Sequence, residues 1–353
     1  MRIPGWAGAV AGWFAGLDPP PDVFSVVMAT GIVAIAARDH GYWYIDSGLG
    51  LVALVAFVVL GLGFVIRVTT HPARVARLAR NPDVALRMFT FCAACVVLGD
   101  HLRWSPVATK ALGGLAVAGW CVLVPLTVVD VWSRRTTQLR DQAHGAWLLP
   151  SVATSGLAGA TAQRAAHDHA PWMVVVAAAA VLLALAIYLA VASLIVWRAL
   201  SGPLLPDQVP PDSWILMGAL AISALASSQL LAAIRALDAP SPAVHAGRTL
   251  VLVVWITASL WVPVLLYAQM WRSDHIPGTL HYEGVWWSAV FPVGMYSAAT
   301  AATGAQLGLP QLTTVSLVFF WIAFTICVLV ATGLVHAGAA RAAALGRVLR
   351  RVR

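Results

Sequence analysis

Residues 284–306 read GVWWSAVFPVGMYSAATAATGAQ, and this stretch predicts more about the fold than any other. About 20 helical residues cross the hydrocarbon core of a bilayer, so the stretch is long enough to span a membrane. Its small and hydroxylated residues are typical of helices that pack against other helices or line a wet interior. Pro292 lies near the middle, where it removes a backbone hydrogen bond, and the bulky Phe291 stands beside it. The stretch therefore predicts a pore wall with Phe291 as a plug.

The composition of the whole chain indicates an integral membrane protein. Of its 353 residues, 60% are hydrophobic and only 10% are charged, whereas soluble domains carry roughly 25% charged residues. The net charge of +8 is explained by basic loops on one side of a membrane, so we expect no nucleic-acid partner. The four cysteines all fall within apolar runs and predict no disulfide framework.

Ten apolar segments follow one another along the chain, and tryptophans mark many of their ends, as in an aromatic belt. The segments cover residues 22–38, 49–69, 84–100, 107–131, 145–163, 172–197, 213–236, 248–271, 284–306 and 312–336. Most odd-numbered segments are small and polar, whereas the even ones are rich in bulky aliphatic residues suited to lipid. We predict an all-α membrane protein of ten transmembrane helices in five hairpins, with the odd helices forming an inner ring around a central pore. A tightly packed inner ring without a pore is the alternative.

The distribution of basic residues predicts the orientation. Sixteen of the 22 Lys and Arg residues lie at the termini or in loops after even segments, which places both termini in the cytoplasm. We predict an interfacial segment at 1–21, a transport domain at 22–336 and a basic cytoplasmic tail at 337–353, in a plasma (inner) membrane protein.

Ionisable residues are missing from the centres of all ten segments. Proton-coupled carriers usually keep an acid or a histidine there, and an intramembrane enzyme needs a buried acid, base or metal site. We therefore expect no enzyme activity, no metal site and no cofactor. Hydroxyls and helix breaks instead predict weak binding of small anions. The residues assigned to this path are Thr30, Pro150, Thr154, Pro292, Ser297 and Thr300. Arg87 and Arg248, at helix starts on opposite faces, are expected to attract anions to the two mouths, or else to serve as interfacial anchors.

Three stretches resemble the tellurite-resistance/dicarboxylate transporter family, which includes malate permease, sulfite efflux pumps and slow anion channels. They are FSVVMATGI at 24–32, GAWLLP at 145–150 and WWSAVFPVGMY at 286–296. The resemblance covers about residues 20–338 and implies an inner ring of five helices around a pore that a phenylalanine of the ninth span closes, here Phe291. The same resemblance places Phe24 and Gly31 among the pore-lining residues and points to a homotrimer.

The expected function is transport of small anions, either dicarboxylates, oxyanions like sulfite or tellurite, or monovalent anions. A proton-coupled exporter of organic acid or sulfite is the alternative within transport. An intramembrane enzyme and a receptor or scaffold with a dry bundle remain as rivals from other classes.

Overall fold

The computed structural model describes residues 22–73, 81–203, 205–277 and 283–352. The described chain is all-helical and holds 11 α-helices and four short 3-10 turns. The α-helices are α2 (Ser25–Asp39), α3 (Trp43–Thr70), α5 (Pro82–His101), α6 (Pro106–Ser133), α7 (Thr136–Gln142), α8 (Leu149–Asp168), α9 (Pro171–Leu200), α10 (Ile215–Ala236), α11 (Ser241–His275), α12 (Trp287–Leu307) and α13 (Gln311–Val352). The 3-10 turns are η1 (Gly145–Leu148), η2 (Pro206–Gln208), η3 (Pro211–Trp214) and η4 (Gly284–Trp286).

Each of the ten predicted segments corresponds to one long helix, and the short α7 is an additional element. Prolines begin several helices, because the first turn has no backbone hydrogen bond to lose. Side-chain caps help: Asn81 accepts a hydrogen bond from the Asp83 amide at the start of α5, and Ser105 accepts one from Ala108 at the start of α6. Gly308 follows α12 in the left-handed conformation (φ 72°) that ends a helix most easily at glycine.

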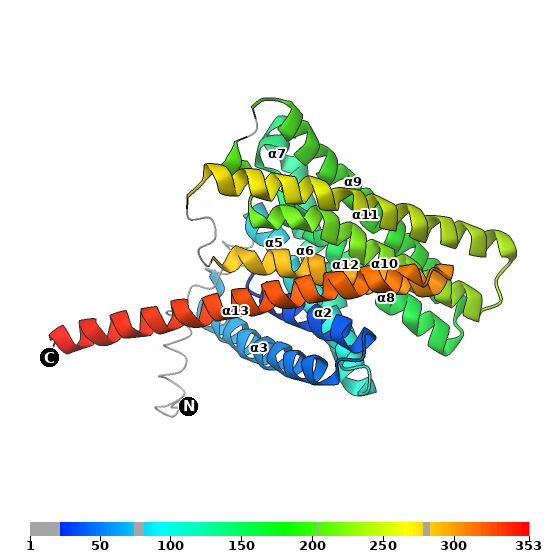
Figure 1. The fold of residues 1–353 in the computed structure, drawn as a ribbon, viewed down its shortest axis with the longest axis horizontal. Helices are drawn as coiled ribbons and strands as arrows, with labels where there is room; N and C mark the ends of the chain where they lie inside the picture. The colour runs from blue at the N-terminus through cyan, green and yellow to red at the C-terminus, as the bar shows by residue number, and fades with distance from the viewer. Residues whose placement is uncertain (1–21, 74–80, 204, 278–282, 353) are drawn as a thin grey trace.

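Helices α2, α5, α8, α10 and α12 form a closed ring, in which each helix contacts the next and α12 contacts α2. Each ring helix also packs against the helix that follows it, which lies outside: α3, α6, α9, α11 and α13 respectively (Figure 1). Burial follows this division, since 83% of the apolar window of α10 is buried against 11% in α3. The predicted division into small, buried odd helices and bulky, exposed even helices is therefore present in the structure.

Within the described residues, seven helices are long and apolar enough to cross a membrane. They are α3, α5, α6, α9, α10, α11 and α13. The other three long helices, α2, α8 and α12, belong to the inner ring. Helix α2 has only 15 residues, and α8 and α12 are rich in Gly, Ala, Ser and Thr, which lowers their hydropathy.

The structure describes the C-terminal end of the chain as far as residue 352, and its description begins at residue 22. The predicted segment 1–21 lies outside the described residues. Helix α13 continues without a break to Val352, beyond the body of the bundle (Figure 1). The residues predicted as a tail are thus helical as far as 352.

Candidate functional site

One face of α12 is fastened to the outer helices by its hydroxyl groups. The Ser297 hydroxyl donates to the carbonyl oxygen of Ser316 on α13, and the Ser316 hydroxyl donates back to the Ser297 carbonyl, both at 2.7 Å. Thr300 accepts a hydrogen bond from the indole N–H of Trp255 on α11 at 3.0 Å. Both hydroxyls are therefore bonded to the outer helices α13 and α11, and a part for Ser297 and Thr300 in an anion path stays a prediction.

The flanks of α12 pack closely against its two ring neighbours. A Cβ placed on Gly218 of α10 would lie 2.8 Å from the Cβ of Pro292. A Cβ on Gly294 would lie 3.1 Å from the Cγ2 of Ile32 on α2. Pro292 does lie inside α12 as predicted, and its ring is packed against α10.

The remaining face of α12 is turned to the inside of the ring. Successive helical residues are about 100° apart, so residues spaced by 4, 3 and 4 share one face. Phe291, Met295, Ala298 and Ala302 have this spacing and lie opposite the face that contacts α11 and α13. Phe291 is buried, with 2% of its surface exposed. We call these four residues the inner stripe of α12.

The hydroxyls of α2 and α8 are also already bonded. The Thr30 hydroxyl donates to the carbonyl of Val26 in its own helix at 2.7 Å. The Thr154 hydroxyl donates to the Pro150 carbonyl at 2.7 Å and accepts from the indole of Trp120 on α6 at 2.9 Å. Both threonine hydroxyls are bonded to backbone or tryptophan groups, and their assignment to an anion path stays a prediction.

Pro150 occupies the first turn of α8, directly after η1. The expectation of a break within the fifth span is therefore corrected to a helix start. Proline is well tolerated there, since the amide it lacks has no partner in the first turn.

Phe24 and Gly31 are packing residues in this structure. The Phe24 ring lies 6.0 Å from Phe57 of α3 and 5.2 Å from Phe91 of α5, measured between centroids. A Cβ on Gly31 would lie 2.8 Å from Cγ1 of Val97 on α5. Phe24 fills an aromatic cluster and Gly31 permits the close approach of α2 and α5, and their assignment as pore-lining stays a prediction.

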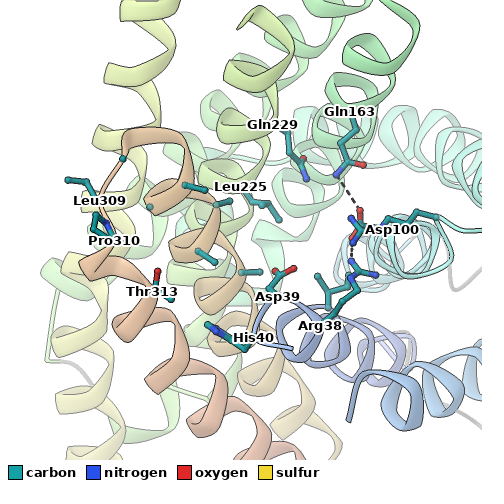
Figure 2. A pocket seen from close by; sticks show the side chains of 18 residues that line it. Arg38, Asp39, His40, Asp100, Gln163, Leu225, Gln229, Leu309, Pro310 and Thr313 are labelled. Atoms are coloured by element: carbon teal, nitrogen blue, oxygen red, sulfur yellow. Dashed lines mark hydrogen bonds and ion pairs between the residues drawn. The ribbon is translucent and has the colours of Figure 1, made fainter. Parts of the chain in front are cut away.

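A cavity of about 680 Å³ opens at the end of the ring where the ring helices have their C-termini (Figure 2). All five ring helices and the start of α13 contribute to it, and we call it the vestibule. Its lining residues are Ile35, Arg38, Asp39, His40, Asp100, Arg103, Gln163, Leu225, Gln229, Ala298, Ala301, Ala302, Gly304, Ala305, Gly308, Leu309, Pro310 and Thr313. Because Ala298 and Ala302 belong to the inner stripe, Phe291 lies on the same face about 10 Å deeper, at 1.5 Å per residue.

The charged groups of the vestibule are arranged as one bonded pair and two separate residues. Arg38 donates to Asp100 at 3.0 Å, and the amide of Gln163 donates to the same carboxylate at 3.3 Å. Figure 2 shows this chain of contacts, with Asp39 apart from it. Asp39 and Arg103 are exposed. Burial lowers the pKa of His40, so its ring is neutral near pH 7.

At the opposite end of the ring lies a second cluster, centred on His144. The imidazole lies 2.7 Å from a carboxylate oxygen of Asp212 in η3 and 2.8 Å from one of Asp83 in α5. Burial alone would lower the pKa of His144, but hydrogen bonds to Asp212 and Asp83 outweigh it and raise the pKa to about 9. His144 is therefore charged at neutral pH and joins the starts of α5, α8 and α10. We call His144, Asp83 and Asp212 the histidine clasp.

The two arginines predicted at the mouths have different surroundings. Arg87 of α5 pairs with Asp83 at 3.1 Å and with Asp22 at 3.5 Å, so its charge is balanced by two carboxylates. Arg248 lies exposed on α11, a helix of the outer layer. Of the two predicted roles, the structure favours an anchor for Arg87.

Residues 22–73, 81–203, 205–277 and 283–352 contain no cluster of side chains suited to bind a metal ion. No group of three His, Cys, Asp or Glu side chains in these ranges is placed to hold an ion.

Comparisons with known proteins identify the family of the chain. The model of the voltage-dependent anion channel family matches residues 19–335, nearly the whole chain. The chain belongs to the voltage-dependent anion channel family. An uncharacterized membrane protein of Mycobacterium tuberculosis strain H37Rv is 32% identical over 163 residues, which cover 46% of this chain and 81% of that protein. A sulfite efflux pump of Arthroderma otae is 23% identical over 322 residues, covering 83% and 84% of the two chains, and that of Trichophyton rubrum is 24% identical over 331 residues, covering 84% and 85%.

Membership in the voltage-dependent anion channel family confirms the resemblance that the three sequence stretches carry. It makes the chain a multi-pass membrane protein of a channel and transporter family, and transport rather than enzyme chemistry is the activity that follows.

Within this channel-family fold, sequence reasoning missed the vestibule and the histidine clasp. The run Arg38-Asp39-His40 after the first segment was a signal for the vestibule, because three ionisable residues together at a helix end mark a polar site. The clasp had no comparable signal, since Asp83, His144 and Asp212 are far apart in the chain.

Proposed function

We propose that the chain conducts small anions across a membrane along the axis of the five-helix ring, with Phe291 as the gate. The observation that carries the proposal is the inner stripe of α12, on which Phe291 lies below the alanines that line the vestibule. An aromatic ring below a vestibule to which all five helices contribute is suited to close a narrow path and to open it by a change of rotamer. Anion transport by the family supports the same function.

The path that this proposal implies is mostly uncharged. The hydroxyls of Thr30, Thr154, Ser297 and Thr300 are bonded elsewhere, which leaves small and apolar side chains on the inner stripe. Such a wall binds an anion weakly, and weak binding permits rapid exit. Arg248 is retained as a candidate for attracting anions at a mouth.

The proposal includes ten membrane-spanning helices in five hairpins with both termini in the cytoplasm of a plasma-membrane protein. Helices α2, α8 and α12 would then cross the bilayer shielded by the outer layer, so their low hydropathy is no obstacle. Assembly into a homotrimer belongs to the same proposal.

The sulfite efflux pumps that resemble this chain bear on which anion it transports. Similarity to sulfite efflux pumps favours a small oxyanion such as sulfite over a C4-dicarboxylate or tellurite. The alternative within transport is a proton-coupled exporter of sulfite or organic acid, and similarity to sulfite efflux pumps is consistent with it.

The test is anion current across planar bilayers that hold the purified protein, with chloride, nitrate, sulfite and malate in turn. We expect Phe291→Ala to raise the conductance strongly, because it removes the ring that closes the path. Phe320→Ala is the matched control: Phe320 is equally buried but stacks on Tyr42 in the outer layer, with centroids 5.3 Å apart. The control should leave the conductance unchanged.

Two outcomes would overturn the proposal. If neither wild type nor Phe291→Ala conducts, and both are folded, the channel is excluded and isotope flux with and without a proton gradient tests the coupled exporter. If both alanine variants raise the conductance equally, Phe291 is not the gate.

A further inference from the structure

The charged side chains that line the vestibule balance one another. They are two arginines and two aspartates, Arg38, Arg103, Asp39 and Asp100, and their charges sum to zero. The five ring helices have their C-termini at this end, and a helix C-terminus carries a partial negative charge. An anion that enters the vestibule from water therefore depends on hydrogen-bond donors, because no net positive charge attracts it there.

Gln229 provides a neutral donor group in this cavity. Its side chain lines the vestibule from α10 and is half-buried. A side-chain amide carries two N–H donors, and within the described part of the chain no group accepts a hydrogen bond from them. The amide of Gln163 on the neighbouring α8 differs, because it already donates to Asp100 at 3.3 Å. Figure 2 shows that bond as a dashed line, and no such line reaches Gln229.

Gly159 of α8 determines how the amide of Gln229 is oriented. A Cβ placed on Gly159 would overlap the Oε1 atom of Gln229. The amide oxygen therefore packs against the backbone of α8, in the space that a glycine leaves open. The Nε2 atom lies on the other side of the amide carbon, so the end of the group that carries the donors is the one turned away from α8.

Gln229 also stands where the polar part of the wall ends. Residues spaced by 4 and 3 along a helix share one face, and on α10 the residues that follow Gln229 toward the interior at this spacing are Leu225 and Ile222. Leu225 also lines the vestibule, and Ile222 is buried. An anion that moves from the vestibule toward Phe291 thus passes from an amide to an apolar wall.

We propose that the amide of Gln229 binds the anion at the entrance of the path and replaces part of its water shell. This inference rests on the proposed function and names a selectivity residue of that same path. Two N–H groups can donate to an oxyanion or a halide, whereas a cation needs an acceptor. A neutral donor binds more weakly than a fixed charge, so the anion can leave again toward Phe291.

The test measures nitrate current in planar bilayers that hold the full-length protein, over a range of nitrate concentrations. Gln229→Met keeps the length and the neutrality of the side chain but removes its donors. It should lower the conductance severalfold and raise the half-saturating nitrate concentration severalfold, because the anion is bound less tightly. Gln229→Glu keeps the shape and should abolish the current, because a carboxylate repels an anion. If the closed gate limits the wild-type current, all variants are compared in the Phe291→Ala protein.

Gln269→Met is the matched control. The amide of Gln269 on α11 donates to the carbonyl of Pro210 at 3.3 Å, and its side chain does not line the vestibule. This variant makes the same chemical change and should leave both the conductance and the half-saturating concentration as in wild type.

Each outcome bears on a separate claim. If nitrate carries current and Gln229→Met changes neither quantity, the amide is not a binding group and the channel stands. If Gln269→Met changes both quantities as much, the effect is not specific to the vestibule and the inference is again wrong. If neither wild type nor Phe291→Ala passes nitrate, with both folded, the proposed function itself fails. Gln229→Leu provides a second variant without donors should the methionine protein not fold.

Discussion

At the scale of single residues, His144 shows how a buried polar group stabilises the ring. Its two nitrogens face the carboxylates of Asp83 and Asp212, and the Ala146 amide also donates to Asp212 at 3.2 Å. Gly145 is required beside it, because a Cβ there would overlap the Asp212 carbonyl. Removing one partner of such a cluster leaves a buried charge without compensation, which is more costly than the loss of a surface pair.

The clasp predicts that stability depends on pH. The pKa of His144 is about 9 in the folded protein, above the ordinary histidine value of about 6.5. The stabilisation is therefore fully present below about 6.5 and is lost as the pH rises through about 9. Thermal unfolding of detergent-solubilised protein should show a falling midpoint across this window. His144→Gln should have a lower midpoint at neutral pH and a flatter profile, and parallel profiles for the two proteins would contradict the clasp.

At the scale of elements, the ring is held by two kinds of contact. Inner and outer helices are joined by hydrogen bonds from tryptophan to threonine, Trp120 to Thr154 and Trp255 to Thr300. Neighbouring helices of the ring approach each other closely at small residues, for example where Gly218 of α10 lies against Pro292 of α12. The hydroxyls of Thr154 and Thr300 thus fasten helices to one another, because a buried hydroxyl without a partner is costly.

The contact between α10 and α12 gives a prediction with an internal control. Gly218→Ala should lower the free energy of unfolding by about 1–3 kcal/mol, because the added methyl must displace the Pro292 ring. Gly114→Ala on the exposed face of α6, where nothing lies within 4 Å, should instead raise it by up to about 1 kcal/mol through helix propensity. Thermal or denaturant unfolding in detergent measures both. Equal effects in the two variants would contradict the close approach.

At the scale of the whole molecule, the ring and its outer layer explain why three long helices need not be strongly apolar. The outer helices present large aliphatic and aromatic side chains, and the ring helices are covered by them. The proposed topology of ten spans requires that α2, α8 and α12 cross the bilayer while the outer helices separate them from lipid.

Thiol labelling tests the crossing of α8. In a cysteine-free background, Thr137→Cys precedes the helix and His167→Cys stands in its last turn, both at exposed positions. A membrane-impermeant reagent should label His167→Cys in intact cells and Thr137→Cys only in inverted vesicles. Labelling of both from the same side would show that α8 does not cross.

The sequence by itself determined the class, the helices and their sorting into two layers. Ten apolar segments and the alternation of small and bulky residues are local properties that composition and length carry, so they were readable without contacts. The prediction of Phe291 as the gate was made in the same way, since a large ring beside a proline in a run of small residues is a local feature. Family membership, too, followed from three short stretches.

Only the tertiary structure decided which way each side chain points. A hydroxyl on a helix has the same sequence signature whether it faces a path or a neighbouring helix, so only the structure shows that Thr154 and Thr300 accept hydrogen bonds from tryptophans and that Ser297 bonds to Ser316. The clasp and the vestibule likewise bring together residues from helices far apart in the chain. Their partners are set by how five helices close into a ring, and that closure depends on contacts between segments that no local pattern records.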